Sequence, residues 1–346
     1  MNYFVERGVL DATPIKRAAY SDRMAWMLSE FSRLVYEELP QEKSVTGLID
    51  KIKDLVLKGK VETEIKGLLS DFVERSGREQ SSVEVILGKN KMKLIDSFVK
   101  GDTEALLAEI SDHDESFMIL AFRGTSSVKD VFTDARAKLK PAIGGGRAHD
   151  GFHGGLHLIL EDIRRRIAQQ ARTTPLYITG HSLGGAWAML ATKYLQDFNI
   201  GATYTYGCPR VADDEFYNSV RSPVYRIVHR ADMVTRLPFG HGLRFFLNFF
   251  RLIPINGTKR ISEWLRRNIA GYTHYGHLIY IQGELKTESN PSTVTVKHSP
   301  NIFIVLEDLG KQLLNSFGNL AKDHFMINYC GKLAERAKDR NPSSQG

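Results

Sequence analysis

The stretch Tyr177-Ile178-Thr179-Gly180-His181-Ser182-Leu183-Gly184-Gly185-Ala186-Trp187-Ala188 decides the fold. It begins with β-prone residues, passes through the pattern G-x-S-x-G and ends in small residues that suit a helix. In a nucleophile elbow, a tight strand-to-helix turn raises a serine, and flanking glycines prevent side chains from colliding. Gly180 and Gly184 provide these glycines around Ser182. The pattern by itself is weak, and a purely structural glycine turn is the alternative interpretation.

Strands and helices alternate on the carboxyl side of this stretch. The expected strands are PLYIT (175–179), ATYTYG (202–207), VYRIVH (224–229) and LIYIQ (278–282), and AWAMLATKYLQDF (186–198) is expected to be helical. This alternation predicts an α/β architecture, in which ligands bind beyond the carboxyl ends of the strands.

The segments 82–87, 103–110 and 116–122 also show the composition of strands, and the last two flank a polar turn, which predicts a hairpin. Nearer the amino end, Ser21 is a plausible N-cap for a helix with an apolar stripe over 24–35, and another stripe covers 306–320.

We therefore expect a central mixed, mostly parallel sheet flanked by helices, with helical segments at both ends of the chain. The expected division is 1–80 for an amino-terminal helical segment packed on the core, 81–300 for the core, and 301–346 for a carboxyl-terminal helix and tail. Within the core, 236–270 forms a basic, aromatic insertion or cap.

The composition is that of a globular protein. The chain has 346 residues, of which 42% are hydrophobic and 25% charged. Its start lacks the apolar region of a secretory signal, and no stretch has the ~20 apolar residues of a membrane-spanning helix. We expect a cytoplasmic or peripheral membrane location, without excluding unconventional secretion. Two cysteines, Cys208 and Cys330, cannot form a disulfide framework.

A serine hydroxyl becomes a good nucleophile only when a base takes its proton and an acid orients that base. The chain order expected after this elbow is serine, then aspartate or glutamate, then histidine. Six histidines follow the serine: His229, His241, His274, His277, His298 and His324. His274 and His277 share a loop before the strand 278–282 and are the two candidates for the base.

The acid is expected at Asp232, which directly follows the strand 224–229, at the edge where a carboxylate would reach the histidine. Asp213 and Asp214 come earlier and suit the cap of a following helix better.

With these residues the chain resembles the class 3 lipases, fungal-type α/β-hydrolases that cleave acyl esters of glycerol. The resemblance covers about half of the chain and rests on AFRGT (121–125), HDGF (149–152), TGHSLGGAWA, YGCPRV (206–211), ADMVTRLP around Asp232, and YTHYGHLIYI. A fainter likeness extends to the helix near residue 30 and to Asp323-His324 with Tyr329.

The resemblance implies Ser182 as nucleophile, Asp232 as acid and His274 as base, with His277 as its rival. It implies an oxyanion hole formed by the backbone N–H groups of Thr125 and Leu183. The family's lid would fall at 126–135, where a short apolar stripe consists of Val128, Val131 and Phe132. An ordinary packed helical turn explains that stripe almost as well.

The chain has a net charge of +7, and its basic residues are concentrated between 221 and 267. This stretch contains ten basic residues and two acidic ones. Inside this stretch an aromatic face consists of Phe245, Phe246, Phe249 and Phe250. A short basic amphipathic helix suits the surface of an anionic membrane. The alternative is a cap helix buried against the core. No nucleic-acid partner is expected, because no known binding motif accompanies the charge.

The expected function is a serine-dependent carboxylic ester hydrolase, most simply a lipase acting on acylglycerols. A phospholipase A1 on anionic membranes and a non-catalytic module that binds lipid surfaces are the alternatives. The serine mechanism needs no metal or organic cofactor, and none is expected. The cluster His149-Asp150-Gly151-Phe152-His153 could suggest a metal site, but it lacks a third ligand of clear spacing. The sequence leaves the oligomeric state open.

Overall fold

The computed structural model describes residues 3–4, 19–37, 39–40, 52, 56, 65–67, 69–70, 81–112, 115–124, 139–230, 232, 234–236, 271–287, 290–300 and 323–339. Its elements are, in chain order, α2 (Asp22–Leu34), α5 (Ser82–Lys89), β1 (Met92–Lys100), β2 (Thr103–Asp112), β3 (Glu115–Phe122), β4 (Leu139–Pro141), β5 (Arg147–His149), α7 (Asp150–Ala168), β6 (Leu176–His181), α8 (Leu183–Tyr194), β7 (Ile200–Tyr206), α9 (Asp214–Tyr217), β8 (Val224–His229), the 3₁₀ turn η1 (Val234–Arg236), β9 (His277–Gln282), β10 (Thr295–His298) and α14 (Met326–Asp339).

The main sheet of the described chain has the strand order β1-β2-β3-β6-β7-β8-β9-β10. The strands from β3 to β9 pair in parallel, whereas β1, β2 and β10 join the two edges antiparallel. The prediction of a mixed, mostly parallel sheet is confirmed. The hairpin predicted over 103–122 is also confirmed, as β2 and β3.

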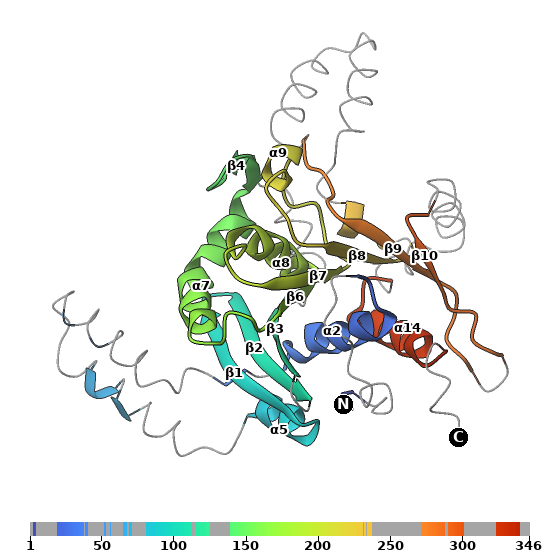
Figure 1. Cartoon of the computed structure of the whole chain (residues 1–346), viewed down its shortest axis with the longest axis horizontal. Coiled ribbons are helices and arrows are strands. Elements are labelled where there is room, and N and C mark those ends of the chain that lie inside the picture. The colour runs from blue at the N-terminus through green and yellow to red at the C-terminus, as the bar shows by residue number, and fades with distance from the viewer. Residues whose placement is uncertain are drawn as a thin grey trace, which may run out of the picture.

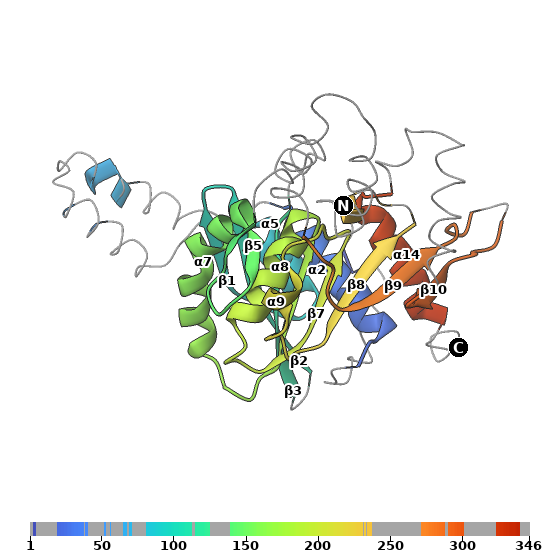
Figure 2. The same ribbon diagram turned by 90° about the horizontal axis from the view of Figure 1, so that it is seen from above.

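Helices cover both faces of this sheet (Figure 1). On one face α7 and α8 pack over a cluster that includes Ile178 and Leu190, and on the other α2, α5 and α14 pack over a cluster that includes Tyr206. Figure 2 shows the same layers from above. The helices α2 and α14 lie side by side although they come from opposite ends of the chain.

The central strand β6 is buried along its whole length, as expected for a parallel strand with helices on both faces. The predicted N-cap of α2 is confirmed, because the Ser21 side chain accepts a hydrogen bond from the N–H of Met24.

The prediction of a strand over 82–87 is wrong, because these residues form the helix α5. Ser81 and Glu84 form a capping box: the Ser81 hydroxyl accepts from the Glu84 N–H at 3.2 Å, and the Glu84 carboxylate accepts from the Ser81 N–H at 2.8 Å. The first strand, β1, starts later and was not predicted.

The predicted helical stripe over 306–320 lies outside the described residues, and the division at 80 and 300 stays a prediction. Among the helices of the described residues, none is long and apolar enough to cross a membrane.

Candidate active site

Ser182 sits on a strained turn between β6 and α8. Its backbone has φ 58° and ψ −124°, a conformation that is uncommon for a residue with a side chain and is found where function requires it. The turn is tight enough that a Cβ on Gly180 would lie 2.2 Å from the Gly184 carbonyl oxygen, and one on Gly184 would lie 2.2 Å from that of Phe122. Both glycines are therefore required, and the predicted elbow geometry is present.

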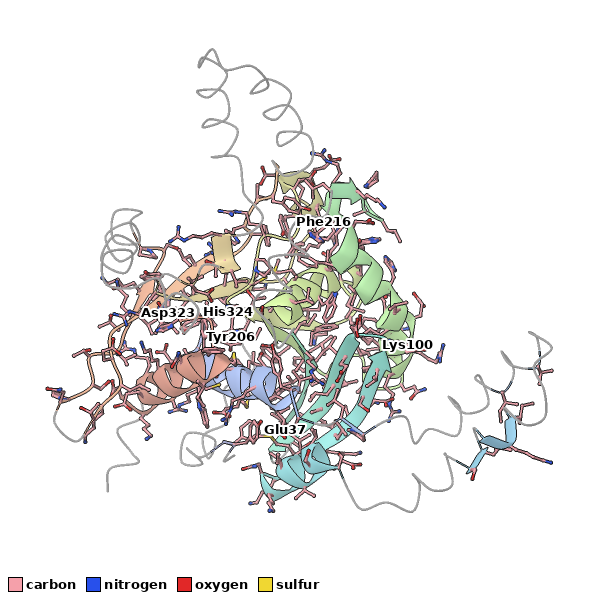
Figure 3. The ribbon with its side chains drawn as sticks, turned by 180° about the vertical axis from the view of Figure 1, so that it is seen from behind. Glu37, Lys100, Tyr206, Phe216, Asp323 and His324 are labelled. Carbon is pink, nitrogen blue, oxygen red and sulfur yellow. The ribbon has the colours of Figure 1, made fainter. Side chains whose placement is uncertain are left out.

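The hydroxyl of Ser182 contacts an imidazole, that of His324. Ser182 Oγ lies 2.8 Å from His324 Nε2. The other ring nitrogen, Nδ1, lies 2.8 Å and 3.0 Å from the two carboxylate oxygens of Asp232. With Nδ1–H donating to the carboxylate, Nε2 is left to accept the serine proton. The three groups are buried, and they form a hydroxyl–imidazole–carboxylate chain (Figure 3 labels His324).

The assignment of the base to His274 is wrong. The Nε2–H of His274 donates to the carbonyl oxygen of Thr235 at 2.6 Å, so its ring is engaged elsewhere. Burial lowers the pKa of His274 far below its usual range, and the nearby Arg226 and Arg210 lower it further. His277, the rival candidate, is exposed at the start of β9, and its ring stacks on Tyr225. Neither imidazole contacts Ser182.

The Asp232 carboxylate has three donors. Besides His324, the Tyr329 hydroxyl donates to Oδ2 at 2.7 Å and the Val234 N–H donates to Oδ1 at 3.0 Å. Burial alone would raise the pKa of Asp232, but the charge and hydrogen bond of His324, with the Tyr329 hydroxyl, outweigh it and keep the pKa below its usual range. The carboxylate therefore stays ionised and can hold the imidazole in one orientation.

Gly207, at the end of β7, makes room for the Asp232–His324 pair. A Cβ there would lie 2.6 Å from Asp232 Oδ2 and 3.0 Å from His324 Nδ1, and the residue has φ +56°. Both the space and the backbone conformation require glycine.

Leu183 is the first residue of α8, so its N–H belongs to the helix start, where backbone N–H groups lack intrahelical acceptors. That position suits a donor to an oxyanion. Thr125 lies outside the described residues, one position after Gly124. A Cβ on Gly124 would lie 2.4 Å from the His181 carbonyl oxygen, which places the end of this loop against the elbow.

The lid residues Val128, Val131 and Phe132 and the aromatic residues Phe245, Phe246, Phe249 and Phe250 also lie outside the described residues. Their assignments stay predictions.

The histidines near α7 have structural partners. His149 caps α7 by accepting from the Phe152 N–H at 3.3 Å, and His153 Nε2 lies 3.1 Å from His157 Nε2. Among the described residues, no group of three or more His, Cys, Asp or Glu side chains is arranged to hold a metal ion.

His324 was not predicted as the base, and no role was predicted for Tyr329. The order serine, aspartate, histidine fits His324 as well as His274. One signal in the sequence favours His324: Asp323, His324 and Tyr329 faintly resemble the family's pattern. Tyr329 lies five positions after His324, on the first turn of α14.

A strained serine on a strand–turn–helix elbow, followed in chain order by a carboxylate and an imidazole that contact one another, defines an α/β-hydrolase. Residues 119–241 match the family model Lipase (class 3). Over these residues the chain is similar to the class 3 lipases.

Individual proteins are similar to parts of this chain. A lipase of Rhizomucor miehei is 32% identical over 151 residues, 40% of this chain and 41% of the relative. The chloroplastic phospholipase A1-Igamma1 of Arabidopsis thaliana is 23% identical over 289 residues, 66% of this chain and 52% of the relative. The crystal structure of a lipase from Rhizopus microsporus var. chinensis superposes with a TM-score of 0.44 at 24% identity, covering 63% of this chain and 68% of that chain. The chain thus spans about two fifths of the length of the first curated relative.

Proposed function

We propose that this protein is a serine-dependent carboxylic ester hydrolase that acts as a lipase on acylglycerols. The observation that carries the proposal is the buried chain from Ser182 Oγ through His324 to Asp232, with contacts of 2.8 Å at each step. These distances are those of a nucleophile and a general base within hydrogen-bond reach.

In the proposed reaction, His324 Nε2 takes the proton as Ser182 Oγ attacks the ester carbonyl. The imidazolium that forms is stabilised by Asp232, and it then gives its proton to the departing alcohol. The serine ester that remains is hydrolysed by water, with His324 acting as the base again. The step needs no metal or organic cofactor.

The oxyanion of each tetrahedral intermediate would be met by the N–H of Leu183 and, in the proposal, by that of Thr125. Donors that are already oriented toward the developing charge typically contribute about 10²–10³ in rate each. The position of Leu183 at the start of α8 supports its part in this role, because the helix start also favours negative charge.

Acylglycerols are the substrate class supported by the relatives. One of them is named secreted mono- and diacylglycerol lipase 1, from Fusarium solani, and is 31% identical over 140 residues. Phospholipase A1 activity is the second candidate, because the relative with that name aligns over 66% of this chain. The basic excess between 221 and 267 favours an anionic lipid surface in that case.

We also propose peripheral contact with a lipid interface through the aromatic face of Phe245, Phe246, Phe249 and Phe250. Replacing these four residues by serine should abolish the preference for aggregated substrate and spare short soluble esters. An equal loss of both activities would assign the four side chains to the core.

The test measures the release of fatty acid from emulsified long-chain triacylglycerol and from phospholipid vesicles. Release is monitored by pH-stat titration, with Ser182→Ala as the control. Release from the emulsion that Ser182→Ala abolishes supports a lipase, and release mainly from vesicles supports the phospholipase. Without release from either substrate, the lipid assignment would be withdrawn in favour of short-ester hydrolysis or a non-catalytic role in lipid binding.

A further inference from the structure

The backbone that carries His324 is held by side chains from other parts of the fold. His324 precedes α14, and its ring must keep one position to contact both Ser182 and Asp232. The carbonyl groups of Asp323 and His324 each accept a hydrogen bond from a buried imidazole. Figure 3 labels Asp323 and His324, the residues that lead into α14.

The carbonyl oxygen of His324 accepts from His181. His181 Nε2 lies 2.7 Å from this oxygen, and the two rings face one another with centroids 4.6 Å apart. The other nitrogen of His181, Nδ1, lies 3.1 Å from the hydroxyl of Tyr36, just after α2. With the Tyr36 hydroxyl donating to Nδ1, the proton of the ring is on Nε2, where it reaches the His324 carbonyl.

The carbonyl oxygen of Asp323 accepts from His229, at the end of β8. His229 Nδ1 lies 3.0 Å from this oxygen. The ammonium group of Lys332, one and a half turns into α14, lies 2.6 Å from His229 Nε2 and donates to it. Lys332 also donates to the Gly283 carbonyl at 2.5 Å. The proton of this ring is therefore on Nδ1, where it reaches the Asp323 carbonyl.

Both imidazoles are held neutral. Burial lowers the pKa of His181 to about 3, helped by the nearby His324. Burial lowers the pKa of His229 to about 4, helped by the charge of Lys332. A neutral ring has one donor and one acceptor, so the partner on one nitrogen fixes which nitrogen donates to the loop.

We propose that His181 and His229 are positioning residues that fix two consecutive peptide groups of the segment bearing the catalytic base, with Tyr36 and Lys332 setting the tautomer of each ring. The inference rests on the proposed hydrolytic function of His324. Displacing a reacting group by about 1 Å can cost about 10² in rate, so small movements of this backbone matter.

The two rings use different nitrogens, which makes the proposal sharply testable. The amide nitrogen of asparagine occupies approximately the place of imidazole Nδ1, and that of glutamine the place of Nε2. His229→Asn therefore keeps the donor to Asp323, and His181→Gln keeps the donor to His324. The exchanged variants, His229→Gln and His181→Asn, lose these donors although they too replace histidine by a neutral amide side chain.

The experiment measures kcat and KM on a soluble short-chain ester and the labelling rate of Ser182 by a fluorophosphonate, for all four variants. We expect His229→Asn and His181→Gln to stay within about 3-fold of the wild type. For His229→Gln and His181→Asn we expect kcat and labelling rate to fall about 10²-fold with KM unchanged.

His149 supplies the matched control, because it is also buried and hydrogen-bonded but caps α7. His149→Asn and His149→Gln should give the same kcat as one another, whatever their melting temperatures. The proposal would be overturned if the same amide, asparagine or glutamine, gave the higher kcat at both position 181 and position 229. Equal kcat values for all four variants would also overturn it.

The proton resonance of His324 Nδ1–H, strongly downfield when paired with Asp232, gives a readout that needs no turnover. It should persist in His229→Asn and His181→Gln and broaden or shift in the exchanged pair. Because this signal is independent of substrate, it separates failure of the positioning role from failure of the proposed lipase activity. An unchanged signal in all four variants would also contradict the positioning role.

Discussion

The nucleophile and the base of this site are held in opposite ways. Ser182 is placed by its immediate neighbours: β6 before it, α8 after it and the glycines at 180 and 184. His324 is placed by contacts distant in sequence, since Ser182, Asp232 and His181 lie 142, 92 and 143 residues away along the chain. The comparison teaches that a local pattern can identify the nucleophile of a triad, whereas the base depends on the assembled sheet and on α14.

The largest effect is expected at the locally determined residue. Ser182→Ala should lower kcat by about 10⁴-fold or more, because the acyl-enzyme can no longer form. Thermal unfolding should change little, since the side chain is small and the flanking glycines remain. The measurement is hydrolysis of a soluble ester beside a melting curve. Retention of more than a few per cent of activity would mean that another nucleophile operates.

The next prediction compares two histidines. His324→Ala should cost about as much activity as the serine variant, because members of a triad act as a unit. His274→Gln keeps a donor toward the Thr235 carbonyl and should stay within about 10-fold of the wild type. Fluorophosphonate labelling of both variants checks this. The reverse ranking would restore His274 as the base and contradict the structure.

A smaller effect is expected where the two regions meet. Gly207→Ala brings a Cβ to 2.6 Å from Asp232 Oδ2 and forces a side chain onto a backbone with φ +56°. We expect kcat to fall about 10²-fold through displacement of the Asp232–His324 pair, and stability to fall by about 1 kcal/mol or more. The matched control is Gly88→Ala, where the added Cβ meets nothing within 4 Å. Equal activities of the two variants would contradict this account of Gly207.

The last prediction concerns stability alone, through its dependence on pH. His229 has a folded-state pKa of about 4, below its ordinary value, so the unfolded chain binds the extra proton in acid. Its contribution to stability is therefore complete above about pH 6.5 and is lost as the pH falls toward the folded pKa. His229→Asn should flatten this part of the curve, measured by urea unfolding at several pH values.

His229→Asn removes the titrating ring but leaves the charged groups around it in place, so it separates their effect on stability from that of His229. These groups are Lys332, Arg230, Asp323 and Asp232. A curve as steep as that of the wild type would assign the pH dependence to those groups instead of His229.

Much of the fold could be predicted because its signals are local. The strand 224–229 was predicted with the bounds that β8 has, and the elbow follows from glycines that no other residue can replace. The error over 82–87 has a physical reason: alternating valines suit a strand, but the capping box of Ser81 and Glu84 starts a helix there. Local hydrogen bonding outweighed the side-chain pattern.

Two of the three residues of the triad could be predicted from the sequence. Ser182 and Asp232 follow directly on strands, so their places at the sheet edge could be inferred. The place of His324 depends on how α14 packs beside α2, which no local pattern records. The positions of His181, His229 and Lys332 against its backbone are likewise a product of tertiary packing.

Trapping the covalent intermediate tests the roles of Ser182 and His324 in one experiment. Wild-type protein is mixed with an excess of an activated long-chain ester, quenched in acid before one turnover is complete, and digested for peptide mass mapping. We expect an acyl group on the peptide containing Ser182 in the wild type and none in the His324→Ala protein. Acylation at a different residue, or none in the wild type while the ester is consumed, would contradict it.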